Sequence, residues 1–266
     1  MLTRIITSLV GLPLIVWLLI SGGAALLAAL LCVTIIGMHE FHKATGREST
    51  LKTVFCIIAA TGYFGLFLWH STTADFMAVI ALTVVASSIS LVVCRKTVDY
   101  IDAALMIMGF FYVAFLLGFV FLLRERESGV FLVWLAFIAA WGADTCAYFT
   151  GMLCGKHKLC PELSPKKTIE GAIGGVLGAV VLALLFQWLV VYYFNYTFDF
   201  ASSTLAVIIA IAAMLSIFGD LSASAIKRQT GVKDFGKLFP GHGGILDRFD
   251  SVLFTAPAIY IMLNYF

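Results

Sequence analysis

Apolar segments long enough to cross a membrane recur along the whole chain and constrain its fold more than any other feature. About nine such runs lie between charged or turn-rich breaks, at about 5–21, 24–38, 51–69, 76–94, 103–123, 130–150, 172–194, 203–219 and 249–266. Because backbone polar groups find no water in lipid, continuous runs of roughly 20 apolar residues form helices. The sequence therefore predicts an all-α, polytopic integral membrane protein with about nine transmembrane helices.

The composition fits a single membrane domain. Hydrophobic residues make up 62% of the 266 residues, and charged residues make up 12%. The six cysteines form no CxxC pair, so neither a disulfide framework nor a zinc site is indicated. The run after Arg4 could be read as a signal peptide, but the later spans favour a first membrane helix. We expect one transmembrane domain, residues 1–266.

The distribution of basic residues orients the predicted helices. With nine spans the loops alternate sides, and fifteen of the 17 Lys and Arg residues then fall on one side. Only Arg124 and Arg126 fall on the other. Basic loops of membrane proteins face the cytoplasm. We therefore expect a bacterial-type inner (plasma) membrane protein with its N-terminus and basic loops in the cytoplasm and its C-terminus outside. Setting this topology is enough to explain the basic residues of the first half.

A carboxylate interrupts the sixth predicted span. Asp144 lies near the cytoplasmic end of that span, where an ionisable residue is costly and is therefore a functional candidate. A structural partner for a lysine on a neighbouring helix is the alternative. In the loop that follows, Lys166 and Lys167 come directly before Thr168 and Glu170, at a predicted helix start. Cations beside the free N–H groups of a helix N-terminus favour anion binding.

Glycines flank this basic loop on both sides. The spacing from Gly151 to Lys156 is one residue short of a P-loop, and His157 stands where a P-loop has its magnesium-binding hydroxyl. A P-loop hydrolase is therefore disfavoured. The next helix opens with glycines at positions 171, 174, 175 and 178, which predict close packing against a neighbouring helix.

The most charged stretch of the chain, Ser224 to Asp250, lies between the last two predicted spans. It holds eight of the chain's charged residues and five of its 23 glycines. If the eighth helix continues beyond the lipid boundary, Asp220, Ser224 and Lys227 share one face, with Arg228 close by. An acid, a hydroxyl and two bases would then meet at the water interface.

Three carboxylates around this stretch predict a divalent-metal site. Asp247 and Asp250 are three residues apart at the expected start of the last helix, so both can point the same way. Together with Asp220 they form a hard-oxygen set of the kind that binds Mg²⁺ in company with substrate phosphates. His242 lies among glycines, and both a phosphate hydrogen bond and a structural role are open for it. The combination favours metal-assisted transfer between phosphates.

The stretch from Ser224 to Asp250 reads S-x-I-K-R-x4-K-D-x-G-x2-F-P-x-H-G-G-I-x-D-R-F-D. It resembles the signature of the phosphatidate cytidylyltransferases, also called CDP-diacylglycerol synthases. Two upstream stretches, D-x-x-A-Y-F-x-G from Asp144 and S-P-K-K-T-x-E-G from Ser164, are also similar to that family's pattern. The resemblance covers about 140–255 and implies that this is the catalytic half of the domain. The first half matches in its hydropathy and in an acid after the second span, Glu40.

The resemblance implies a Mg²⁺-dependent nucleotidyltransferase of phospholipid biosynthesis. Such an enzyme joins CTP and phosphatidic acid into CDP-diacylglycerol and releases pyrophosphate. In this family the acids that match Asp220 and Asp247 are expected to hold the metal, with K⁺ as a candidate second ion. The expected partners are the two substrates, membrane lipid and a second copy of the chain in a homodimer, without nucleic acid.

The chemistry of each side chain suggests its role in such a reaction. Carboxylates would hold the metal, while Lys and Arg would neutralise the triphosphate, the lipid phosphate and the leaving pyrophosphate. The metal set is Asp220, Asp247 and Asp250; the catalytic set is Asp220, Asp247, Lys227 and Arg228; and the substrate-binding set is Lys167, Ser224, Lys233, His242, Arg248 and Asp144. The lipid phosphate is already ionised at neutral pH, so its in-line attack on the α-phosphorus needs no strong general base.

Two other classes of function fit parts of the sequence. A CTP-dependent enzyme with another lipid acceptor, such as a CDP-archaeol-type synthase or a polyprenol kinase, would share the charged interfacial site. A transporter or flippase for an anionic substrate could use Asp144 and the basic loops. Alternating access calls for a site near the bilayer midplane, however, and the charged stretch lies on one side. Its position favours an enzyme at the cytoplasmic interface, where a soluble nucleotide meets a lipid phosphate.

Overall fold

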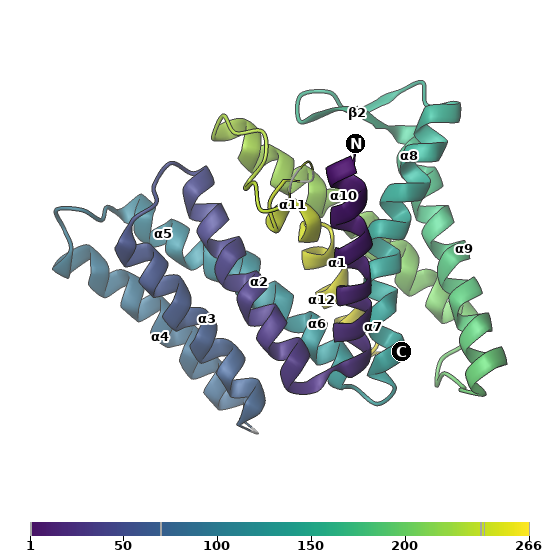
Figure 1. Ribbon diagram of the computed structural model, residues 1–266, viewed down its shortest axis with the longest axis horizontal. Coiled ribbons are helices and arrows are strands. Elements are labelled where there is room, and N and C mark those ends of the chain that lie inside the picture. Colours follow the sequence, from purple (N-terminus) through teal and green to yellow (C-terminus); the bar gives the residue numbers. More distant parts are fainter. Residues whose placement is uncertain (1, 70, 240, 242, 266) are drawn as a thin grey trace. The chain divides into compact units, whose positions relative to one another are not determined.

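The computed structural model describes residues 2–69, 71–239, 241 and 243–265, most of which are helical (Figure 1). Its elements in chain order are α1 (Leu2–Ser21), α2 (Gly23–Ala44), α3 (Thr50–Leu68), α4 (Thr73–Val93), α5 (Tyr100–Gly109), the π-helical η1 (Phe110–Phe115), α6 (Leu116–Glu125), α7 (Gly129–Phe137), the π-helical η2 (Ile138–Gly142), α8 (Ala143–Cys154), β1 (Lys158–Cys160), β2 (Ser164–Thr168), α9 (Ile169–Phe194), α10 (Ser202–Gln229), α11 (Leu246–Phe249) and α12 (Val252–Met262).

Seven helical segments in the described part of the chain are long and apolar enough to cross a membrane. They correspond to the second to eighth predicted runs, and two of them contain a π-helical turn within a longer continuous helix. The prediction of an all-α, polytopic membrane protein is therefore confirmed. The first and last predicted runs coincide with α1 and α12, whose apolar stretches Gly11–Ser21 and Val252–Met262 are shorter. The count of nine spans stays a prediction.

The last helix begins later than the sequence predicts. Asp247 lies in the four-residue helix α11, and α12 starts only at Val252, so Asp247 and Asp250 do not share the first turn of one helix. Asp250 Oδ1 accepts a hydrogen bond from the Ser251 N–H at 2.8 Å. Such a local side-chain bond competes with the helical backbone ladder. The expectation that both carboxylates point the same way from one helix start is therefore corrected.

The chain divides into two compact units. Unit 1 comprises Met1–Phe121 and Thr230–Arg248, and unit 2 comprises Leu122–Gln229 and Phe249–Phe266. The charged stretch that follows α10 therefore belongs mostly to unit 1, whereas α10 itself and Asp250 belong to unit 2. A single transmembrane domain over 1–266 stays a prediction.

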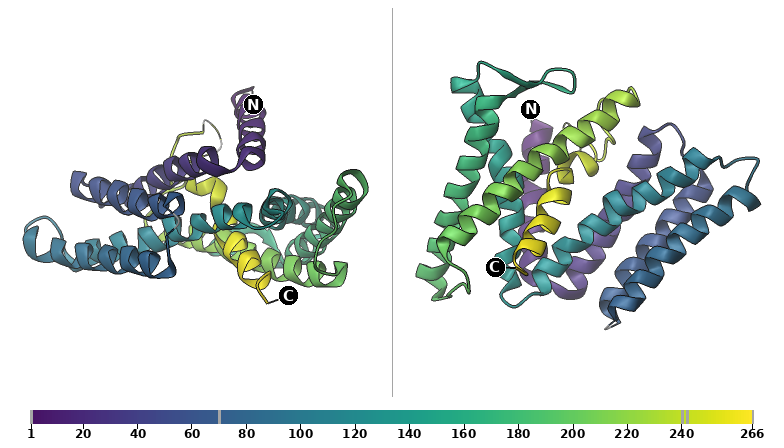
Figure 2. Two further views of the ribbon diagram at one scale, coloured as in Figure 1. Left: turned by 90° about the horizontal axis from the view of Figure 1, so that it is seen from below. Right: turned by 180° about the vertical axis from the view of Figure 1, so that it is seen from behind.

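Unit 1 is held together by aromatic side chains between its helices. In sequence order α2 packs on α3 and α3 packs on α4, as Figures 1 and 2 show. Tyr63 of α3 is 2% exposed and packs edge-on against Phe76 of α4 and Phe110 of η1. Gly118 faces the same ring, because a Cβ at this position would lie 2.6 Å from the Tyr63 hydroxyl oxygen. Edge-to-face pairs of this kind add stability beyond their buried area.

Charged side chains of unit 1 join the loop before α3 to the start of α5. Lys52 is 3% exposed, and its Nζ donates to Asp102 Oδ1 at 2.5 Å. Arg47 Nη1 donates to the same Oδ1 at 3.1 Å and to Asp99 Oδ2 at 2.8 Å. A buried charge needs such a partner, because leaving it unpaired costs several kcal/mol. Beside any role in topology, Arg47 and Lys52 therefore hold helix ends together.

In unit 2, helices α8 and α9 pack very closely through glycines. A Cβ at Gly171 would lie 2.9 Å from the Ala147 carbonyl oxygen, and one at Gly175 would lie 2.8 Å from that of Ala143. Gly174 and Gly178 face α8 in the same way. The close packing predicted from the glycine spacing is confirmed. It brings the backbone of α9 against α8 next to Asp144.

A β-hairpin that the sequence did not predict connects α8 to α9. Strands β1 and β2 pair antiparallel, with Lys158 opposite Thr168 and Cys160 opposite Ser164. Figures 1 and 2 show this hairpin beyond the adjoining ends of the two helices. The predicted helix start is confirmed, because Thr168 is the N-cap of α9 and its Oγ1 accepts the Gly171 N–H at 3.1 Å.

Candidate active site

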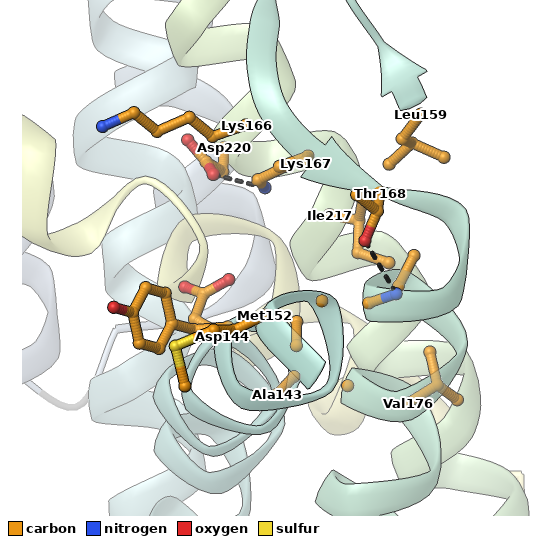
Figure 3. Close-up of a pocket in the computed structure, with 16 residues that line it drawn as sticks. Ala143, Asp144, Met152, Leu159, Lys166, Lys167, Thr168, Val176, Ile217 and Asp220 are labelled. Carbon is orange, nitrogen blue, oxygen red and sulfur yellow. Dashed lines mark hydrogen bonds and ion pairs between the residues drawn. The ribbon is translucent and has the colours of Figure 1, made fainter. Parts of the chain in front are cut away.

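A cavity in unit 2 brings together two lysines of the hairpin and two carboxylates of the neighbouring helices. It has a volume of about 360 Å³ and is lined by Asp144 of α8, Lys166 and Lys167 of β2, and Asp220 of α10. Figure 3 shows the Asp144 carboxylate directed toward the space below Lys167 and Asp220. Small and apolar residues of α8, α9 and α10 form most of the remaining wall. The cavity therefore combines a charged end with an apolar lining.

Asp220 is the acid at which the hairpin and α10 meet. Its Oδ2 forms an ion pair with Lys167 Nζ, drawn as a dashed line in Figure 3. Ser224 Oγ donates to Asp220 Oδ1 at 3.5 Å. Because α10 continues to Gln229, the predicted shared face of Asp220 and Ser224 is confirmed. This face of the helix offers both an anion and a hydroxyl to a ligand.

The basic end of α10 lies beside the same hairpin. Lys227 and Arg228 occupy the last turn of α10, and Arg228 Nε donates to the Leu163 carbonyl oxygen at 3.4 Å. Leu163 belongs to the turn between β1 and β2. Cations in the last helical turn are favoured by the helix dipole. Both predicted phosphate-binding bases are thus at the polar end of α10, and Arg228 also contacts the hairpin.

Asp250 lies just before α12, among other charged groups of unit 2. Burial raises the pKa of its carboxyl to about 7, and the Asp220 carboxylate adds to this rise, while the Ser251 N–H and Lys227 oppose it. Asp144 Oδ2 accepts a hydrogen bond from Ser251 Oγ at 3.4 Å. A raised carboxyl pKa means that nearby positive groups and hydrogen bonds do not fully offset the loss of solvation of the charged form. A bound cation would offset the remainder.

Asp247 has a structural role that the sequence did not reveal. It is 8% exposed, and its Oδ2 accepts the backbone N–H groups of Phe235 and Gly244, both at 2.9 Å. Gly243 is packed against it, since a Cβ there would lie 2.7 Å from Asp247 Oδ2. This carboxylate therefore shapes the glycine-rich loop of unit 1. A metal-binding role for Asp247 stays a prediction.

Glu40 of α2 is a residue whose importance sequence reasoning missed. It is 5% exposed, and its Oε2 accepts the Leu246 N–H at 3.0 Å, at the start of α11. Gly236 and Gly244 leave room for it, because a Cβ at either position would lie within 2.4 Å of a Glu40 carboxyl oxygen. The signal available in the sequence was an acid directly after the second apolar run. Glu40 and Asp247 together hold the described parts of the loop after α10, residues 235–239 and 243–247.

Comparison with known proteins places this arrangement in a family. A model of the cytidylyltransferase family matches residues 2–266. The chain belongs to the cytidylyltransferase family. A phosphatidate cytidylyltransferase of Staphylococcus saprophyticus is 33% identical over 268 residues, covering 99% of each chain. Those of Staphylococcus haemolyticus and Staphylococcus aureus are each 32% identical over 272 residues, with the same coverage. The resemblance seen in the sequence motifs is confirmed.

Two further predicted site residues, Lys233 and Arg248, lie in unit 1. Lys233 is an exposed residue of the loop after α10, and Arg248 is an exposed residue of α11. His242 lies outside the described residues. Within unit 2, the structure brings together Asp144, Lys167 and Asp220 around one cavity. Lys166 joins them there, although the sequence analysis noted it without including it in the binding set.

The predicted metal can be compared with the side chains present. Carboxylate oxygens are the ligands that Mg²⁺ prefers, and Asp220 already accepts a cationic partner, Lys167. Across the ranges that the structure describes, no three Asp, Glu, His or Cys side chains are grouped to hold a metal ion. The carboxylates of unit 2 are of the kind that binds Mg²⁺, but among the described residues they are not grouped as a metal site there, so both the metal and its ligands stay a prediction.

Proposed function

We propose that this chain transfers the cytidylyl group of CTP to phosphatidic acid, giving CDP-diacylglycerol and pyrophosphate in phospholipid biosynthesis. The observation that carries the proposal is the match to named phosphatidate cytidylyltransferases along 99% of the chain. The cavity of unit 2 supports it, because lysines and carboxylates there meet an apolar wall. A nucleoside triphosphate and a lipid phosphate together require both a charged surface and an apolar one.

The reaction moves one phosphorus centre between two oxygen partners. A phosphate oxygen of phosphatidic acid forms a bond to the α-phosphorus of CTP, and the bond from that phosphorus to the α,β-bridging oxygen breaks. Pyrophosphate leaves with the bonding electron pair. The attacking oxygen is ionised at neutral pH, so catalysis consists mainly of positioning and of neutralising charge. This is what a cluster of lysines can supply.

Lys167 is the side chain best placed for this neutralisation. Its ammonium lies against Asp220 in the cavity, and a triphosphate would offer it several further anionic partners. Lys166 lines the same cavity, and Lys227 and Arg228 lie at the end of α10. Positive groups that meet charge developing in the transition state contribute several kcal/mol to catalysis. We assign phosphate binding to these four bases.

The apolar wall of the cavity suits the lipid substrate. Ala147, Gly171, Gly175, Val176 and Ile217 line it. Gly171 and Gly175 face α8 without side chains, so α8 and α9 approach closely there. Membrane-facing helices offer a lipid direct access from the bilayer, whereas CTP arrives from water. The acyl chains of phosphatidic acid would lie along this wall, with its phosphate near the lysines.

Mg²⁺ dependence is part of the same proposal. Asp220 and Asp250 are the candidate ligands in unit 2, Asp247 is the third predicted ligand, and K⁺ is a candidate second ion. A divalent cation on the phosphates would neutralise charge and favour departure of pyrophosphate. Asp144 and Ser224 would orient ligands through their oxygen atoms. Titrating Mg²⁺ into metal-stripped enzyme while following pyrophosphate release tests the dependence.

The orientation in the membrane follows from the charge bias. We place the N-terminus, the hairpin and the polar end of α10 in the cytoplasm, and the C-terminus outside. A single cysteine added at the C-terminus, in a variant that lacks the six native cysteines, should react with a membrane-impermeant thiol reagent from outside. Labelling restricted to the cytoplasmic side would contradict nine spans. The expected homodimer can be tested by crosslinking in intact membranes.

One assay separates the proposal from its nearest alternative. Detergent-purified protein is incubated with CTP, Mg²⁺ and a panel of acceptors: phosphatidic acid, an archaeal-type ether lipid phosphate and a polyprenol. Pyrophosphate and the CDP-lipid are measured together, and so are CDP and polyprenyl phosphate, because a polyprenol kinase would transfer the γ-phosphate of CTP and release CDP. Phosphatidic acid should give pyrophosphate and the CDP-lipid in equal amounts. Pyrophosphate without a CDP-lipid, no reaction with phosphatidic acid, or a clear preference for another acceptor would defeat the proposed function.

A further inference from the structure

The segment of residues 156–170, here called the basic hairpin, carries two lysines of the cavity on a small support. Its strands are three and five residues long, and an isolated two-stranded hairpin is marginally stable in water. It nevertheless places Lys166 and Lys167 at the cavity. Contacts outside the strand pairing must therefore hold it in place.

One carboxylate makes most of these contacts at the base of the basic hairpin. Glu170, in the first turn of α9, accepts the Lys156 N–H at 3.1 Å and the His157 N–H at 3.2 Å through Oε2. Its Oε1 lies 2.6 Å from His157 Nδ1. The Ile169 N–H also donates to the His157 carbonyl oxygen at 2.9 Å. Glu170 thus ties the beginning of the hairpin to the helix that follows it.

Thr168, the residue next to Lys167, is held by the end of α8. Thr168 is 9% exposed and caps α9. Gly151 and Gly155 pack so closely on it that a Cβ at these positions would lie 2.9 and 2.8 Å from Thr168 Oγ1. The backbone around Lys167 therefore has little freedom as long as the base of the hairpin stays closed.

Glu170 itself does not line the cavity, and neither does His157. We propose that Glu170 is a positioning residue, which clamps His157 and the backbone at 156–157 so that β2 presents Lys167 to the phosphates of CTP. This role rests on the proposed function, because it assigns phosphate binding to Lys167. Glu170 acts through the backbone and not on the reacting atoms.

The first experiment compares substitutions at the clamp. Glu170→Ala should raise the KM for CTP about tenfold, on the scale of one lost charge-assisted hydrogen bond, with a smaller change in kcat. Glu170→Gln should recover most of this loss, because an amide oxygen still accepts the backbone N–H groups. His157→Ala removes one of the three contacts and should give an intermediate effect.

A matched control separates the clamp from loss of charge. Glu162→Ala removes the same charge from the exposed turn of the same hairpin and should leave the KM unchanged. If Glu162→Ala raises the KM as much as Glu170→Ala does, the effect is one of general electrostatics and the clamp is refuted. A KM for CTP that is unchanged in Glu170→Ala refutes it as well.

Two further measurements test whether Glu170 acts through Lys167. Hydrogen exchange of the amides at 156–168 should accelerate in Glu170→Ala, while exchange in α10 stays as in the parent; an unchanged hairpin would overturn the proposal. In CTP-binding measurements, Glu170→Ala alone should lower the affinity for CTP. Added to a Lys167→Met variant, the same substitution should lower the affinity little further. Fully additive losses of affinity would show that the two residues act independently. A parent enzyme that makes no CDP-lipid defeats the proposed function, whereas an active parent with an insensitive Glu170 defeats the clamp alone.

Discussion

Lys167 of β2 and Asp220 of α10 form an ion pair in the cavity of unit 2. Their side chains are 24% and 27% exposed, so the pair is reached by solvent and by ligands. The two residues are distant in the sequence and come from different kinds of element. This ion pair joins the hairpin that we propose to bind phosphates to the acid that we expect to bind a cation, and nucleotide phosphates and their counterion require both kinds of group.

Replacing Asp220 with Asn should reduce kcat/KM for CTP by at least about a hundredfold. The change removes the charge that pairs with Lys167 and that would contact a cation, and a lost transition-state interaction of several kcal/mol corresponds to two or more decades of rate. Pyrophosphate release by the purified variant measures the effect. Asp199→Asn removes a charge from an exposed loop and serves as the control. Activity of Asp220→Asn within about tenfold of the parent would remove Asp220 from the site.

Replacing Glu40 with Ala should loosen the loop segments 235–239 and 243–247. The Leu246 N–H loses its acceptor, and an unsatisfied buried donor costs about 1–3 kcal/mol. Hydrogen exchange in this loop should rise while exchange in the basic hairpin stays unchanged, and activity should fall. Glu48→Ala, at an exposed position after α2, should change neither. Equal protection of the loop in the Glu40 variant and the parent would contradict this role.

The stability of metal-depleted protein should depend on pH through Asp250. Its pKa is raised to about 7 in the folded state, so the folded state binds the proton more tightly than the unfolded state does. The contribution of Asp250 to stability is then fully present below about pH 4 and is lost as the pH rises toward 7. Asp250→Asn should have a higher melting temperature than the parent at pH 8, with the difference vanishing near pH 4. A constant difference at every pH would rule out this titration.

Replacing Gly175 with Ala should destabilise unit 2. The new Cβ would lie 2.8 Å from the Ala143 carbonyl oxygen, and because this atom belongs to the backbone of α8, the helices must separate. We expect a loss of about 1–3 kcal/mol, typical of overpacking. The control is Gly62→Ala in α3, where nothing lies within 4 Å of the added atom and where Ala favours helix formation. Thermal unfolding in detergent should show a lower midpoint for the Gly175 variant alone.

Local patterns predicted the elements that depend on local interactions. The long apolar runs predicted the membrane helices, the spacing of Asp220 and Ser224 placed them on one helical face, and Thr168 marked the start of α9. The hairpin was not predicted, because its strands are short and lack alternating apolar residues. It is stabilised by Glu170 and by the packing of Thr168 against glycines of α8. The break at Asp250 was missed because a side-chain bond replaces a helical one there.

Sequence by itself determined that this is an all-α membrane protein of the cytidylyltransferase family, and it predicts a set of acids and bases at the membrane interface. Hydrophobic length and periodicity are properties of consecutive residues, so they can be read without a fold. Tertiary structure decided which charges meet: Lys167 pairs with Asp220, and Glu40 caps α11 from 206 residues away. Such contacts depend on how closely helices approach one another. Helices α8 and α9 approach closely because Gly171 and Gly175 have no side chains to separate them.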